Sequence, residues 1–195
     1  MSAYDYFKQC SDIVISVLVL IILSPLLVLL AILIRITGKG SVIYSQDRIG
    51  KAGKPFVIYK FRSMVYYAEG SVPLLSGTSE ERITRIGKFL RKYRIDEIPN
   101  FLNVVKGDMS IVGPRPERQY FIEQIIVRAP EYAELQKVKP GITSWGQVRF
   151  GYASDVDEMV ERLQYDLYYL KHRSLWFDLK IVFLTFGTIL KGKGI

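Results

Sequence analysis

Asp96 and Glu97 form an acidic pair that follows a strongly basic part of the chain. From Arg82 to Arg94 there are six Lys or Arg residues and no acidic residue. The apolar residues after the pair recur at helical spacing and predict a short helix, with Asp96 at its N-cap and Gly107 placed to end it. The unpaired N–H groups at such a helix start favour an ionised carboxylate and attract phosphate.

A carboxylate in that setting can attack phosphorus, which gives an acyl-phosphate and divides one transfer into two steps. The phosphates under attack are themselves anionic, so the reaction requires Mg²⁺ and nearby Arg or Lys side chains. Glu97 could bind this Mg²⁺ through a hard oxygen ligand. Acidic residues are also common in first helical turns for structural reasons, and a basic run is commonly a solvated helix face. Taken alone, the acidic pair and the basic run are therefore each better explained by structure than by chemistry.

A second candidate for phosphate chemistry is the Gly-Pro-Arg-Pro segment at 113–116. Its two prolines fix the backbone on both sides of Arg115, so the guanidinium fork could bind phosphate with little ordering cost. An ordinary surface turn is an equally good interpretation. The sequence contains no Walker-type phosphate loop and no Rossmann glycine fingerprint, so an ATPase or a dehydrogenase is unsupported.

The composition indicates one compact domain with an appended element, because the chain has 195 residues. The net charge of +8 indicates a polyanionic partner: nucleic acid, anionic lipid or a phosphorylated substrate. Cys10 is the only cysteine, which excludes an internal disulfide and a cysteine-based zinc site. His172 is the only histidine and lies in a charged stretch, so we interpret it as a surface residue rather than part of a Ser-His site.

The uncharged segment 13–34 must meet lipid, since a helix of this length is just long enough to cross a bilayer. Acidic residues before it and the lack of a cleavage pattern argue against a signal peptide. Ser24 and Pro25 lie at its middle and predict a bend. On composition alone, a full span is favoured over a helix that returns to the same face. The basic residues that follow place the globular part on the cytoplasmic side.

The remaining pattern predicts an α+β fold that is mostly helical. Its expected elements are short strands at 42–44 and 56–59, a loop at 68–78 that could close over a substrate, and helices starting near 79, 96 and 155. A last helix, 175–190, is rich in aromatic residues but contains Asp178 and Lys180. It is typical of an amphipathic helix that lies on the membrane rather than a second span.

Several segments in order along nearly the whole chain match one known pattern. They are Leu23-Ser24-Pro25, Gln46 with Arg48 and Gly50, residues 59–64 (YKFRSM), residues 95–99 (IDEIP), residues 103–116 (NVVKGDMSIVGPRP) and residues 139–143 (KPGIT). With these residues the chain resembles the bacterial sugar transferase family, the monotopic phosphoglycosyl transferases.

The resemblance implies a re-entrant membrane helix in residues 1–38, kinked at Ser24-Pro25, in place of the full span. Residues 39–195 would form a cytoplasmic catalytic domain with membrane-interface helices. It further implies that Asp96 attacks the β-phosphate of a UDP-sugar, releases UMP, and passes the sugar phosphate to a polyprenyl phosphate such as undecaprenyl phosphate. Asp96 and Glu97 would hold Mg²⁺. The implied phosphate contacts are Lys60, Arg62, Arg91 and Arg115.

The chain departs from the family pattern at Gly40-Ser41, Asn100, Thr143-Ser144 and residues 149–152, so the donor sugar stays open. The implied location is the bacterial inner membrane, with membrane phospholipid as a partner and no nucleic acid. A homo-oligomer is compatible with the sequence, and the chain could be the catalytic end of a longer family member. The alternative to an enzyme is a basic, membrane-bound binding or assembly module without catalysis.

Overall fold

The computed structural model of the chain describes residues 3–65 and 82–192. The fold is α+β and mostly helical with short strands, as predicted. In chain order the elements are α1 (Ala3–Ile36), β1 (Ile43–Ile49), the 3₁₀ helix η1 (Lys51–Gly53), β2 (Pro55–Phe61), α2 (Arg85–Lys92), the 3₁₀ helix η3 (Ile95–Asn100), α3 (Phe101–Lys106), β3 (Ser110–Val112), α4 (Gln119–Arg128), the 3₁₀ helix η4 (Pro130–Lys137), β4 (Gly141–Thr143), α5 (Trp145–Arg149), α6 (Val156–Lys171) and α7 (Leu175–Leu190). The predicted loop at 68–78 lies outside the described residues.

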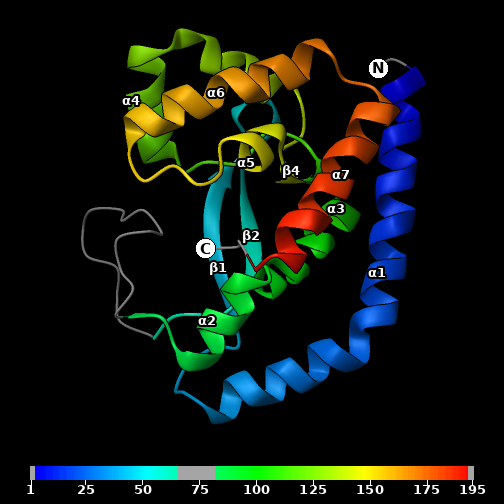
Figure 1. The fold of residues 1–195 in the computed structure, drawn as a ribbon, viewed down its shortest axis with the longest axis vertical. Coiled ribbons are helices and arrows are strands. Elements are labelled where there is room, and N and C mark those ends of the chain that lie inside the picture. Colours follow the sequence, from blue (N-terminus) through cyan, green and yellow to red (C-terminus); the bar gives the residue numbers. More distant parts are fainter. Residues whose placement is uncertain (1–2, 66–81, 193–195) are drawn as a thin grey trace.

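The two predicted strands form an antiparallel hairpin, β1 with β2, through the middle of the molecule (Figure 1). Both strands are longer than predicted, because the pairing extends from Ile43 opposite Phe61 to Ile49 opposite Pro55. Gly53 has a φ of +70° in the connecting turn, a conformation that glycine adopts without strain. β2 packs against η3, so the hairpin brings Lys60 to the acidic pair.

Helix α1 runs along one side of the molecule and changes direction part-way along its length (Figure 1). Pro25 lies inside it and lacks the N–H that would bond to the carbonyl of Ile21. The Ser24 hydroxyl donates to this same carbonyl at 2.8 Å. The Ser-Pro pair therefore supplies its own replacement for the lost backbone bond, which matters in lipid because no water is present to do so.

Within the described residues, α1 is the one helix long and apolar enough to cross a membrane. Only 11% of its most apolar 18-residue window is buried, so α1 is not the covered core helix of a globular domain. This exposure fits a membrane protein. The re-entrant path itself stays a prediction.

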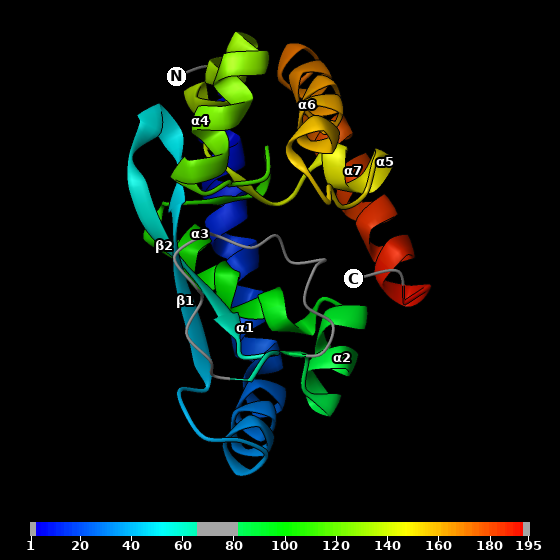
Figure 2. The same cartoon turned by 90° about the vertical axis from the view of Figure 1, so that its left-hand side faces the viewer.

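Both ends of α1 contact the rest of the chain. Near its start, Lys8 forms an ion pair of 2.9 Å with Asp178 of α7, and the Ser110 hydroxyl donates to Asp12 at 2.5 Å. At its other end, Arg62 donates to the carbonyls of Ile34, Gly38 and Lys39, each at 2.8 Å. Figure 2 shows α1 running along most of the height of the molecule, with α3 in front of its middle part.

A second, parallel sheet of β3 and β4 was not predicted from the sequence. The close approach of the two strands requires glycine at both positions 113 and 141. A Cβ on Gly113 would lie 2.5 Å from the Lys139 carbonyl oxygen, and one on Gly141 would overlap the backbone of Gly113. The sheet places the 113–116 turn beside the start of α5.

The helix predicted to start at Asp96 is in fact two elements, η3 and α3, and Asp96 lies in the first turn of η3 rather than at an N-cap. Gly107 ends α3 with a φ of +90°, as predicted. The spacing of the apolar residues predicts one apolar face of Ile98, Phe101, Leu102 and Val105. This face is not the buried one, because Leu102 and Val105 are exposed while Asn103 and Val104 are buried.

The helices predicted near 155 and at 175–190 are confirmed as α6 and α7. Asp155 caps α6 by accepting from the N–H of Glu158 at 2.8 Å. Val156, Met159 and Leu163 are three apolar residues at helical spacing, and Met159 and Leu163 lie in the core. Helix α2 begins at its cap Thr84, later than the predicted start near 79. That α7 lies on the membrane stays a prediction.

Candidate active site

The acidic pair is buried where η3 meets β2 and α2. Asp96 is 8% exposed and Glu97 is 6% exposed. The chain enters η3 through Arg94, which has a left-handed φ of +51°. This conformation costs a non-glycine residue about 1 kcal/mol or more, so the surrounding contacts must hold it. The sharp reversal after α2 places both carboxylates directly beside the end of that basic helix.

Glu97 is surrounded by cations from three segments. Its carboxylate lies 2.6 Å from Lys60 Nζ of β2, 3.6 Å from Arg94 Nη1 and 3.9 Å from Arg115 Nη1 of the 113–116 turn. Burial by itself would raise the pKa of Glu97, but Lys60, Arg94 and Arg115 outweigh it and lower the pKa to about 2. Glu97 is therefore ionised at neutral pH.

The pKa of Asp96 shifts in the opposite direction to that of Glu97. Burial raises its pKa above the ordinary value, the charge of Glu97 raises it further, and Lys60 and Arg91 lower it in part. Two adjacent carboxyl groups with separated pKa values are characteristic of sites that carry out chemistry.

Arg115 is held in place from several sides. Its Nε lies 3.8 Å from Glu117, and its guanidinium stacks over the ring of Tyr152 at 5.1 Å. The buried carboxylate of Asp166 accepts a hydrogen bond from the Arg115 backbone. The flanking prolines and these contacts fix the guanidinium before any ligand arrives, which lowers the ordering cost of binding phosphate.

The four predicted phosphate contacts are not all brought together. Lys60 and Arg115 contact Glu97, and Arg91 is buried close enough to Asp96 to lower its pKa. Arg62 is also buried, but it donates to the carbonyls at the end of α1. These contacts give Arg62 the role of capping α1, and its predicted role in phosphate binding gains no support from them.

The basic run from 82 to 94 divides into two faces. Arg85, Lys88 and Lys92 are exposed, in line with a solvated face, whereas Arg91 and Arg94 turn toward the carboxylates.

The acidic pair suits a magnesium ion that is shared with a substrate. Mg²⁺ is typically held by one or two carboxylates together with phosphate oxygens and water. Asp96 and Glu97 provide two such carboxylates side by side. No group of three or more His, Cys, Asp or Glu residues within 3–65 and 82–192 forms a self-sufficient metal site. The residues thus fit an ion whose remaining ligands come from a diphosphate.

Three residues at the site were not singled out from the sequence: Arg94, Glu117 and Tyr152. Arg94 could have been found as the last member of the basic run. Glu117 accepts from Arg162 at 2.6 Å and lies 3.4 Å from Arg48, both distant in sequence, so no local pattern signals it. Tyr152 lies between two guanidiniums, with Arg94 over its ring at 5.3 Å as well.

We expect Tyr152 to act as a positioning residue for both arginines. A cation–π contact is worth about 0.5–2 kcal/mol, so Tyr152→Leu should lower the kcat/KM of a reaction at this site about 2- to 30-fold. Tyr152→Phe keeps the ring and should stay within about twofold of the wild type. Steady-state kinetics measure kcat/KM for both variants. Arg115→Ala is the reference, and its kcat/KM should be lower than that of either Tyr152 variant. Equal losses in the Leu and Phe variants would contradict a role for the ring face.

Comparison with known proteins identifies the family to which the chain is similar. The family described as "Bacterial sugar transferase" matches residues 3–192. The chain is 44% identical over 98% of its length to a UDP-N-acetylgalactosamine-undecaprenyl-phosphate N-acetylgalactosaminephosphotransferase from Aeromonas hydrophila, and 41% identical over 91% of its length to a UDP-glucose:undecaprenyl-phosphate glucose-1-phosphate transferase from Escherichia coli. It spans 45% and 39% of those two proteins.

A shorter relative is covered more completely. The UDP-glucose:undecaprenyl-phosphate glucose-1-phosphate transferase of Caulobacter vibrioides is 38% identical over 96% of this chain, which spans 71% of that protein. The match to the family therefore covers every element described above, including α1 and the acidic pair, and the chain belongs to the bacterial sugar transferase family.

Proposed function

We propose that this protein transfers a sugar 1-phosphate from a UDP-sugar to a polyprenyl phosphate, such as undecaprenyl phosphate, through a covalent intermediate on Asp96. The names of its relatives support these substrate classes. The observation that carries the proposal is the pair of buried carboxylates with opposite pKa shifts, enclosed by Lys60, Arg91 and Arg115.

In the first step, a carboxylate oxygen of Asp96 attacks the β-phosphorus of the UDP-sugar. The bond from that phosphorus to the bridging oxygen breaks, and UMP leaves with the electron pair. Asp96 becomes an acyl-phosphate that carries the sugar. Arg115 and Arg91 stabilise the negative charge that develops on the phosphoryl oxygens in this proposal.

In the second step, an oxygen of the polyprenyl phosphate attacks the same phosphorus. The acyl-phosphate bond breaks, the Asp96 carboxylate is regenerated, and the product is a polyprenyl diphosphate sugar. Glu97 stays anionic throughout and keeps Lys60, Arg94 and Arg115 aligned around the reacting group. Mg²⁺ bound by Asp96, Glu97 and the diphosphate would neutralise the phosphate charge.

The membrane placement belongs to the same proposal. A helix that crossed the bilayer would leave one end on the far side, yet both ends of α1 contact the same globular part. A re-entrant helix that stays on one face explains both sets of contacts. The proposed face is the cytoplasmic side of the bacterial inner membrane, since basic residues follow the apolar run. Exposed aromatic side chains on α7, including Trp176 and Phe183, would lie at the membrane surface.

The re-entrant path predicts that the start of α1 and the β1–β2 hairpin, which follows its other end, label from the same side of the membrane. Cys10 is the only cysteine. In a Cys10→Ser background, Ala3→Cys and Lys54→Cys should both react with a membrane-impermeant maleimide in inside-out vesicles and neither should react in right-side-out vesicles. Labelling of position 3 and position 54 from opposite sides would establish a spanning helix instead.

The activity is tested by UMP release from a panel of UDP-sugars with Mg²⁺ and polyprenyl phosphate. Mass spectrometry after incubation with the donor alone should find a sugar phosphate on the peptide that contains Asp96. The competing function, a basic binding module, predicts salt-sensitive binding to anionic surfaces, no UMP release and no dependence on Asp96.

A further inference from the structure

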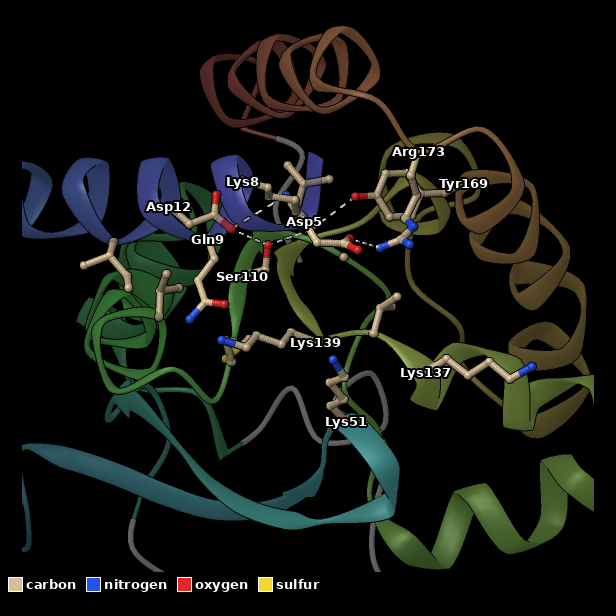
Figure 3. A pocket seen from close by; sticks show the side chains of 16 residues that line it. Asp5, Lys8, Gln9, Asp12, Lys51, Ser110, Lys137, Lys139, Tyr169 and Arg173 are labelled. Atoms are coloured by element: carbon tan, nitrogen blue, oxygen red, sulfur yellow. Dashed lines mark hydrogen bonds and ion pairs between the residues drawn. The ribbon is translucent and has the colours of Figure 1, made fainter. Parts of the chain in front are cut away.

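A cavity of about 120 Å³ lies between the first turns of α1 and the segments around β3 (Figure 3). Neither the acidic pair nor its partners Lys60, Arg91, Arg94 and Arg115 line it. A water molecule takes up about 30 Å³, so the cavity can hold a group of several heavy atoms. Pockets for whole drug-sized ligands are about 300–1,000 Å³, so a nucleotide-sugar does not fit. The volume suits a single small group.

The lining of this cavity is strongly cationic, with five Lys or Arg side chains and two Asp side chains. Three of the cations have carboxylate partners: Lys8 with Asp178 at 2.9 Å, Arg173 with Asp5 at 3.2 Å and Lys137 with Glu134 at 2.7 Å. The other two, Lys51 and Lys139, form no ion pair with any residue in the described parts of the chain. Asp12, which also lines the cavity, lies 3.7 Å from Lys8, so the five cations face four carboxylates in all: Asp5, Asp12, Asp178 and Glu134. The cavity thus keeps an excess of one positive charge, and Lys51 and Lys139 are the two cations without a direct carboxylate partner there.

Lys51 and Lys139 come from η1 and from the segment before β4, and Figure 3 shows both side chains directed into the cavity, with Gln9 and Ser110 on its other side. Burial lowers the pKa of Lys139, and the charge of Lys51 lowers it further, against smaller opposing effects of Asp12 and Asp108. Two ammonium groups that repel each other in a partly enclosed space would both be stabilised by one anion.

The depth of the cavity relative to the membrane indicates where that anion comes from. Ile13, the first residue of the uncharged run, lines the cavity together with the charged residues of the preceding turns. The cavity therefore lies at the boundary between the apolar and polar parts of α1. Lipid phosphate groups lie at this boundary in a membrane.

We propose that this cavity binds one phosphate group, presented by an anionic phospholipid headgroup and held by Lys51 and Lys139. The site would tie the first turns of α1 to the lipid surface at a place separate from the Asp96 cluster. The inference goes beyond the proposed transfer reaction and requires neither a UDP-sugar nor Asp96.

The test compares wild type with the Lys51→Gln/Lys139→Gln double variant, purified as the full chain in neutral detergent. The thermal unfolding midpoint is followed while dihexanoyl phosphatidylglycerol, inorganic phosphate or dihexanoyl phosphatidylcholine is titrated. A Lys54→Gln/Lys171→Gln variant is the control, because it loses the same charge at exposed positions outside the cavity. Each lysine near a lipid phosphate is worth about 1 kcal/mol, so phosphatidylglycerol should bind the double variant roughly tenfold to thirtyfold more weakly.

The control should bind as the wild type does. Saturable binding of phosphatidylglycerol alone assigns the site to the lipid headgroup, and equal binding of inorganic phosphate through the same two lysines assigns it to free phosphate. Identical titrations for wild type and the double variant would overturn the proposal. UMP release by the double variant should be unchanged, so failure of this site and failure of the transfer reaction are separate results.

Discussion

Asp96→Asn is expected to abolish both UMP release and the covalent sugar phosphate, with a loss of at least about 10³-fold in rate. Asparagine has nearly the same shape and keeps the buried site filled, but its amide is not a nucleophile toward phosphorus. UMP release and mass spectrometry of the donor-treated protein measure the two effects. Asp47→Asn is the matched control, since Asp47 is exposed on β1 and away from the acidic pair. Full turnover in the Asp96 variant would rule out the covalent role.

Because the pKa of Asp96 is raised, the rate of donor cleavage should depend on pH. The carboxylate must be ionised to attack, so the rate should fall as the pH drops through the pKa of Asp96, at a higher pH than for an ordinary aspartate near 3.9. Lys60 lowers that pKa, so Lys60→Met should move the acid limb to still higher pH. A pH–rate profile of donor cleavage measures the limb. A shift to lower pH in this variant would contradict the assigned electrostatics.

Glu117→Ala is expected to destabilise the fold by about 3–5 kcal/mol, because it leaves buried positive charge without its partner. Glu117 is 4% exposed and is shared by Arg48, Arg115 and Arg162, the last at 2.6 Å. Thermal or denaturant unfolding in detergent measures the loss. Glu117 also joins three parts of the chain, so activity should fall with stability as Arg115 loses its support.

Two further variants separate this effect from a generic loss of acidic charge. Glu123→Ala removes an exposed carboxylate of α4 and should change stability by no more than about 0.5 kcal/mol. Combining Glu117→Gln with Arg162→Met removes both charges of the shortest ion pair that Glu117 forms, at 2.6 Å. The double variant should recover part of the stability lost in Glu117→Ala. An unfolding midpoint for Glu117→Ala equal to that of the wild type would show that the buried cluster contributes nothing to stability.

Local sequence determined the elements whose signals are local. The hairpin, α6 and α7 follow from apolar periodicity, turn glycines and a capping aspartate, and all three occur near the predicted residues. The acidic pair could also be located, because a carboxylate beside a basic run and a helix start are features of adjacent residues. The backbone hydrogen bond that Pro25 cannot form, and its replacement by the Ser24 hydroxyl, are likewise encoded within five residues, 21–25.

Only the tertiary structure decided which charges meet. Arg62 and Arg115 are both arginines in family motifs, yet one is used to cap α1 and the other faces Glu97. Tyr152, which contacts Arg115, and Arg162, which contacts Glu117, come from distant segments with no pairing signal of their own. The β3–β4 sheet likewise joins two strands of only three residues each. The same holds for the α3 face, where Asn103 and Val104 are buried against β2 in place of the residues that the apolar pattern indicated. Periodicity and caps act between neighbours in the chain, whereas burial and ion pairing are set by whichever segments the fold brings into contact.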